Sequence, residues 1–194
     1  MAVAARRASL VDVSTALVVY ATTHGHTARI SGRIAEELRG HGYEVDLVDV
    51  AAADTARPAD HDIVVVGGSV HAGHHQRDLV DWARRERDEL AASGAAFFSV
   101  SLTAAEDTAE GRAATASMID AFATDSGWTP THAEPVAGAL QYREYDFFTR
   151  TLMKLLMKRG GHSTDTSQDH DFTDWEAVAR FARGLLPADG RAAG

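Results

Sequence analysis

The chain has 194 residues, which is long enough for a single domain with a core of ordinary size. It is 45% hydrophobic and 24% charged, as globular proteins are, and its formal net charge of −9 argues against a nucleic-acid-binding protein, which would carry a basic surplus. The sequence contains no cysteine, so disulfides, thiolate catalysis and cysteine-ligated zinc or iron–sulfur centres are excluded.

Both ends of the chain are predicted to lie outside the fold. Residues 1–15 read as a flexible, alanine-rich leader that lacks the long apolar stretch of a secretory signal, and residues 188–194 read as a flexible tail. No apolar run approaches the roughly 20 residues that are needed to cross a bilayer. We therefore expect one domain over residues 16–187 in a cytoplasmic protein.

The first half of the chain alternates between strand and helix patterns. An apolar, β-branched run at 16–21 predicts a buried strand, and helical spacing follows over 27–40. Residues 43–50 alternate as a second strand, and a connector at 51–60 stands where a helix is short or lost. The uniformly apolar segment 63–66 indicates a third, parallel strand that is covered on both faces.

The second half continues this alternation. Helical spacing over 79–92 precedes a strand at 95–100, and a helix over 113–124 precedes a fifth strand at 132–139. A Thr-Asp-Trp-Glu capping box at 173–176 predicts the start of the last helix. The order predicts an α/β fold with a doubly wound parallel sheet and no internal repeat.

Residues 140–171 do not fit this alternation and form a long insertion between the fifth strand and the last helix. An insertion of this length in a compact domain is usually functional or mobile.

Three loops follow strands at the edge of the sheet where ligands of such folds bind. The first, at 22–27, offers hydroxyls, a glycine and free amides at a helix start, which are the needs of a phosphate. It is neither a Walker A loop nor a GxGxxG turn, and an ordinary threonine-capped helix start is the alternative. The third loop, at 99–103, again presents hydroxyls.

The second loop, at 67–75, begins with two glycines that permit close approach of a ligand. It also holds three histidines, which together with a histidine of the first loop could form a zinc site. No carboxylate accompanies them, so we favour a solvated loop or contact with the edge of a ligand over a metal site. The three loops together predict one crevice.

Residues 18–27, Val-Val-Tyr-Ala-Thr-Thr-His-Gly-His-Thr, resemble the FMN-phosphate signature of flavodoxins. Further segments look like the menaquinone-dependent protoporphyrinogen IX dehydrogenases, which are long-chain flavodoxin-like enzymes of haem biosynthesis. The resemblance runs from about residue 16 to 186. The segments that carry it are 98–102, 137–142, 145–146, 153–158, 160–161, 164–166 and 173–175.

The resemblance implies a flavodoxin-like sheet of five parallel strands in the order 2-1-3-4-5. It also implies FMN-dependent oxidation of protoporphyrinogen IX to protoporphyrin IX, with electrons passed to menaquinone or another quinone. The alternative is an electron-transfer flavodoxin or a quinone reductase that acts on another donor. Neither reading assigns a catalytic residue or requires a metal.

The family's cofactor contacts fall on the three loops. By resemblance, the FMN phosphate would be held by Thr22, Thr23, His24, Gly25, His26 and Thr27. The isoalloxazine would be flanked by Ser69, Val70, His71, Ala72, Gly73, Ser99, Val100, Ser101, Leu102 and Thr103. Two positions depart from the family pattern, because His71 replaces a usual arginine and Ala72 replaces an expected aromatic residue.

The insertion carries the only lysines of this acidic chain, Lys154 and Lys158, in line with Arg150 on one face of an apolar helix pattern. This pattern favours contact with an anionic membrane surface beside a quinone, at the inner face of the cell membrane, or with the propionates of the substrate. The alternative is that the apolar side packs on the domain. We expect substrate contacts from three residues that precede this helix: Tyr142, Arg143 and Tyr145. The sequence leaves open whether the protein is a monomer or a homo-oligomer.

Overall fold

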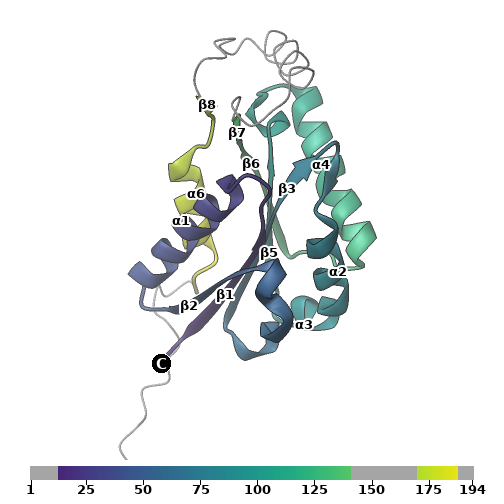
Figure 1. Cartoon of the computed structure of the whole chain (residues 1–194). Coiled ribbons are helices and arrows are strands. Elements are labelled where there is room, and N and C mark those ends of the chain that lie inside the picture. The colour runs from purple at the N-terminus through teal and green to yellow at the C-terminus, as the bar shows by residue number, and fades with distance from the viewer. Residues whose placement is uncertain (1–12, 141–169, 188–194) are drawn as a thin grey trace, which may run out of the picture.

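The computed structural model describes residues 13–140 and 170–187, and they form a parallel sheet between two layers of helices (Figure 1). Its long strands are β1 (Thr15–Ala21), β2 (Glu44–Asp49), β3 (Ile63–His71), β5 (Ala96–Ser101) and β6 (His132–Ala137). They lie in the order β2-β1-β3-β5-β6. Because β5 and β6 are the fourth and fifth long strands along the chain, this order confirms the predicted order 2-1-3-4-5. A further two-residue strand, β4 (His74–His75), pairs antiparallel with the end of β3 and was not predicted.

The helices divide between the two faces of the sheet. Figure 1 shows α1 (His26–Gly40) and α6 (Trp175–Gly184) on one face. The other face carries α2 (Arg77–Arg85), α3 (Arg87–Ala92) and α4 (Ala109–Ser126). The single helix predicted over 79–92 is wrong, because Glu86 at φ −95° and ψ 7° leaves the helical region and divides it into α2 and α3.

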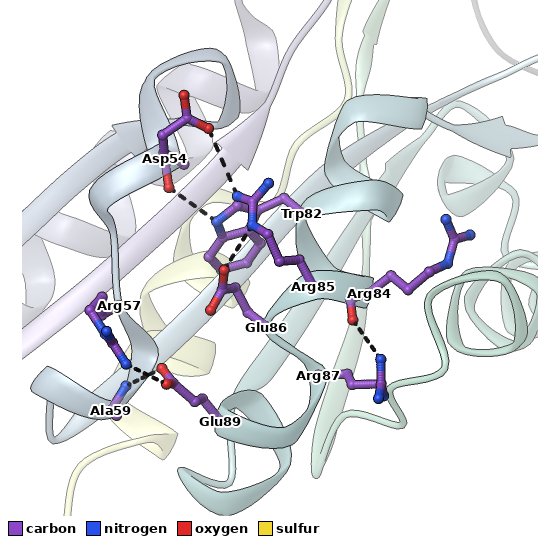
Figure 2. A network of polar contacts seen from close by, with 10 residues as sticks. Asp54, Arg57, Ala59, Trp82, Arg84, Arg85, Glu86, Arg87 and Glu89 are labelled. Atoms are coloured by element: carbon purple, nitrogen blue, oxygen red, sulfur yellow. Dashed lines mark hydrogen bonds and ion pairs between the residues drawn. The ribbon is translucent and has the colours of Figure 1, made fainter.

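The connector predicted at 51–60 is confirmed and consists of two short 3₁₀ helices, η1 (Val50–Thr55) and η2 (Pro58–Asp60). Side chains of α2 and α3 hold it against the domain (Figure 2). The Trp82 indole N–H donates to the carbonyl oxygen of Ala53 at 3.3 Å, and Arg57 pairs with Glu89 at 2.7 Å. The connector is therefore held by hydrogen bonds within its own backbone and by these two side-chain contacts, in the place where a full helix would pack.

Each face of the sheet buries its own apolar core, because the side chains of each strand alternate between the faces. On β1, Ala16 and Val18 pack with α1 and α6, whereas Leu17 and Val19 pack with the α2 side. Two glycines of β3 make room for neighbouring side chains; a Cβ on Gly67 would lie 2.0 Å from the ring of Phe98.

The insertion begins and ends in a short antiparallel pair, β7 (Ala139–Leu140) and β8 (His170–Asp171), beside the end of β6. The predicted capping box is wrong by one residue, because Asp174 is the N-cap and its carboxylate accepts from the Ala177 N–H at 2.9 Å. The Thr173 hydroxyl instead donates to the carbonyl oxygen of Ala137 at 2.8 Å. Within residues 13–140 and 170–187, no helix is long and apolar enough to cross a membrane.

Candidate functional site

The three predicted loops meet at one edge of the sheet. Register places Ala21 of β1 beside Gly68 of β3, and Ser69 beside Val100 of β5, so the carboxyl ends of these strands are neighbours. Gln76 then joins two of the loops, since its amide nitrogen lies 2.5 Å from the Ser69 hydroxyl and 3.4 Å from that of Thr23. The ends of the three strands therefore lie side by side, and two of the loops are linked by Gln76, a residue that the sequence patterns did not single out.

The first loop presents an uncapped helix start. Gly25 adopts φ +82°, in the left-handed region, and its N–H donates to the Thr22 hydroxyl at 2.9 Å. Helix α1 then begins at His26 with no side-chain cap, so its first-turn amides can serve an anion. This arrangement differs from the threonine-capped alternative, because the residue at the N-cap is a glycine. Thr23 is exposed, whereas Thr27 is buried.

His26 lies between this loop and the start of α6. Only 7% of the residue is exposed, and its Nε2 is 2.7 Å from the Thr173 hydroxyl and 3.7 Å from the Asp171 carboxylate. The other ring nitrogen, Nδ1, is buried without a hydrogen-bond partner. Burial lowers the pKa of His26, while Asp171 opposes that shift and Arg29 adds to it.

The second loop is a hairpin and not the irregular loop that was expected. Strand β3 continues to His71, the chain reverses at Ala72 and Gly73, and His74 pairs back with His71. Both turn residues have positive φ, +50° and +85°, as a type I′ turn requires. The His71 ring meets that of His24 edge to face, with the ring centroids 5.7 Å apart. Burial lowers the pKa of His71, and the nearby His24 ring lowers it further by a smaller amount.

The His75 side chain contacts residues of β5 and α4. Its Nε2 lies 2.9 Å from the Ser99 hydroxyl, and its ring packs against Phe97 and Phe122 with centroids 5.3 and 5.1 Å away. Burial, with a smaller contribution from His74, lowers the pKa of His75 to about 4. The loop histidines thus point to different partners, and among the described residues no three His, Asp or Glu side chains are grouped to hold a metal.

The third loop uses most of its hydroxyls internally. Ser99 is buried against His75, and the Ser101 hydroxyl accepts from the Ala104 N–H at 3.2 Å. Val100 belongs to the core on the α1 side, while Leu102 and Thr103 are partly exposed. Backbone groups and the Thr103 hydroxyl are therefore what this loop can offer a ligand.

The six residues expected to contact substrate, quinone or membrane lie outside the described residues: Tyr142, Arg143, Tyr145, Arg150, Lys154 and Lys158. The stem that closes their segment is described, and it stands beside the first loop. Asp171, the last residue of β8, lies 3.6 Å from Arg29 of α1 as well as near His26. The insertion thus begins and ends next to the candidate phosphate loop.

Comparisons with known proteins agree with this fold. A model of the flavodoxin domain matches residues 17–167. The chain is 36% identical over 167 residues to the protoporphyrinogen IX dehydrogenase (quinone) of Leishmania major, covering 86% of this chain and 72% of that protein. It is 33% identical over 169 residues to the protein of the same name from Escherichia coli strain K12, covering 87% and 93%.

Solved structures show the same fold at low sequence identity. A short-chain flavodoxin associated with a bacterial microcompartment superposes with a TM-score of 0.53 at 18% identity, covering 89% of this chain and 96% of that one. Oxidised flavodoxin 1 from Bacillus cereus gives 0.50 at 14% identity, covering 87% and 95%. At such identities these likenesses establish the fold alone.

Proposed function

This chain belongs to the flavodoxin-domain family that includes the protoporphyrinogen IX dehydrogenases (quinone), and from that premise we propose that it uses FMN to oxidise protoporphyrinogen IX to protoporphyrin IX. The electrons pass to menaquinone or another quinone, and the reaction serves haem biosynthesis. Membership makes the chain a flavodoxin-fold oxidoreductase and indicates a flavin cofactor. The observation that carries the choice of substrate is the one-third identity over 86–87% of the chain, which extends beyond the phosphate loop.

The residues at the edge of the sheet fit FMN. A phosphate suits the uncapped start of α1, where Gly25 is left-handed and the buried Nδ1 of His26 has no partner. Residues 22–27 would hold that phosphate. The hairpin residues 69–73 and the loop 99–103 would flank the ring system, with backbone groups supplying most of the hydrogen bonds.

When bound, FMN would supply reversible electron uptake from the donor and delivery to the acceptor. The chain's own contribution is to hold the three loops in place. Gln76 ties the hairpin to the first loop through Ser69 and Thr23, and His75 ties it to β5 through Ser99.

His71 is the titratable side chain best placed to meet the substrate at the hairpin. Its lowered pKa leaves the ring neutral near pH 7, so it can accept a hydrogen bond or a proton that the porphyrinogen gives up. Arg143 would bind a substrate propionate, together with Tyr142 and Tyr145. These assignments rest on resemblance and on residue chemistry.

The positive charges of Arg150, Lys154 and Lys158 would bring this cytoplasmic protein to the inner face of the cell membrane, where a quinone is available. The support is compositional, because the insertion holds the only lysines of a chain with a net charge of −9. Three cations spaced four residues apart in the sequence, each contributing about 1 kcal/mol near an anionic surface, would give reversible peripheral binding.

A second candidate is an electron-transfer flavodoxin or quinone reductase, which the acidic surface favours because it suits docking to basic partners. Anaerobic mixing of the FMN-loaded protein with protoporphyrinogen IX separates the two. We expect loss of oxidised-flavin absorbance together with porphyrin fluorescence. A flavin that a quinol or another donor reduces, but that protoporphyrinogen leaves oxidised, would move the function to the second candidate.

An Arg143→Ala variant sharpens this experiment, because the substitution removes a propionate contact and leaves the FMN loops intact. The loss of one charge-assisted hydrogen bond should raise KM for protoporphyrinogen about tenfold without changing FMN affinity. An unchanged KM would remove Arg143 from the substrate site.

A further inference from the structure

The hydrogen bonds around His26 assign its tautomer. The Thr173 hydroxyl has one proton and lies 2.8 Å from the carbonyl oxygen of Ala137, which can only accept. Thr173 therefore donates to Ala137 and accepts from His26 Nε2 at 2.7 Å. With the proton of the neutral ring on Nε2, Nδ1 is an unprotonated acceptor.

That acceptor is buried without a partner beside the start of α1. A buried polar atom is normally hydrogen-bonded, so an unpaired one calls for an explanation such as a ligand. The ligand expected at the positive, uncapped end of a helix is an anion. A phosphate dianion has no proton to donate, so Nδ1 can pair with it only after taking up a proton of its own.

The surroundings of the ring can stabilise an imidazolium. The Asp171 carboxylate of β8 lies 3.7 Å from Nε2, and it also faces Arg29 of α1 at 3.6 Å. The Arg29 guanidinium lies over the Trp175 ring, 5.2 Å from its centroid, and its charge opposes protonation of His26. Trp175 of α6 meets the His26 ring edge to face and adds no charge, so Asp171 is the counter-ion.

We propose that His26 binds the FMN phosphate as an imidazolium, so that cofactor binding takes up one proton from solvent and leaves His26 paired between the phosphate and Asp171. This inference rests on the proposed FMN function. The balance is one neutral imidazole, one phosphate dianion and one proton combining into one complex. A monoanionic phosphate that shares its own proton with Nδ1 gives the same net uptake above the phosphate's second pKa of about 6.

The burial that lowers the pKa of His26 in the free protein makes this uptake measurable near neutral pH, because the ring is then neutral before FMN arrives. Binding should weaken as pH rises through the interval between the free and the bound pKa. Within that interval, the Kd for FMN should rise by up to tenfold per pH unit, as for any equilibrium linked to one proton.

The test is calorimetric titration of the apoprotein with FMN at about pH 7.5, above the second phosphate pKa, in two buffers of different ionisation enthalpy. Wild type should take up as much as one proton with FMN and none with riboflavin, which lacks the phosphate. His26→Gln can still donate an amide hydrogen but cannot titrate, so its uptake should vanish and its Kd should become independent of pH. His41→Gln, at the opposite end of α1, should behave as wild type.

Asp171→Asn provides a second route if His26→Gln folds poorly. It keeps the histidine and removes the counter-ion, so the pH at which FMN binding weakens should fall. Equal proton uptake in wild type and His26→Gln, or an unchanged pH profile in Asp171→Asn, would overturn the role of His26 while FMN binding stands. Failure of wild type to bind FMN would instead overturn the proposed function, and this inference with it.

Discussion

His75 should make the folded protein sensitive to acid. The ring packs edge to face against the stacked rings of Phe97 and Phe122 and is bonded to Ser99, and burial lowers its pKa to about 4 from an ordinary value of 6.5. The folded state therefore prefers the neutral ring. Its contribution to stability is fully present above pH 6.5 and is lost as the pH falls towards 4.

The size of the effect follows from the two pKa values. Each unit of pKa difference corresponds to about 1.4 kcal/mol, so lowering the pH from about 8 to about 4.5 should remove roughly 2.5 kcal/mol of unfolding free energy through this one residue. That is a large share of the stability of a typical domain. The assay is urea unfolding, followed by circular dichroism, at both pH values.

His75→Gln removes the titration while its amide can still bond Ser99. The variant should be less stable than wild type at about pH 8, and the difference should shrink or reverse at about pH 4.5 because the acid loss of roughly 2.5 kcal/mol is absent. His132→Gln, at an exposed histidine, is the matched control and should keep the acid sensitivity of wild type. Equal pH dependence in wild type and His75→Gln would refute this account.

Three further substitutions test the packing of the framework, each by urea unfolding. Gly67→Ala should destabilise the fold by about 2 kcal/mol or more, because the added Cβ would lie 2.0 Å from the Phe98 ring; a loss below about 0.5 kcal/mol would contradict this packing. Ala72→Asn should stabilise it by up to about 1 kcal/mol, since asparagine tolerates the φ of +50° in the hairpin turn; no gain would argue against the left-handed turn. Trp82→Phe should cost about 1–2 kcal/mol by leaving the Ala53 carbonyl unpaired, and a neutral effect would mean that water replaces the indole.

The framework of the sheet was predictable because burial on both faces leaves a direct pattern in the sequence. The apolar run at 63–66 is a central parallel strand, and the loops after β1, β3 and β5 had to meet once the strand order was known. The hairpin at the end of β3 was missed because Ala72-Gly73 lacks the Asn-Gly or Asp-Gly pair that marks a type I′ turn.

The rest of the site depends on contacts between residues distant in the chain, which no local pattern records. His26 and Thr173 are 147 positions apart, yet the Thr173 hydroxyl bonds both the His26 ring and the end of β6. That bond also explains the displaced cap, because Thr173 is engaged elsewhere and Asp174 takes its place. Gln76 likewise gained its role only when the fold brought Ser69 and Thr23 together.

The most direct test of the central claim is anaerobic turnover of protoporphyrinogen IX by the FMN-loaded protein, with and without a menaquinone analogue, followed by porphyrin fluorescence and flavin absorbance together. Without quinone, we expect the flavin to become reduced and porphyrin formation to stop once the flavin is used up. With quinone, we expect the flavin to be reoxidised and porphyrin to accumulate well beyond the amount of protein. A flavin that stays oxidised in the presence of protoporphyrinogen IX, in a protein that binds FMN normally, would contradict the account.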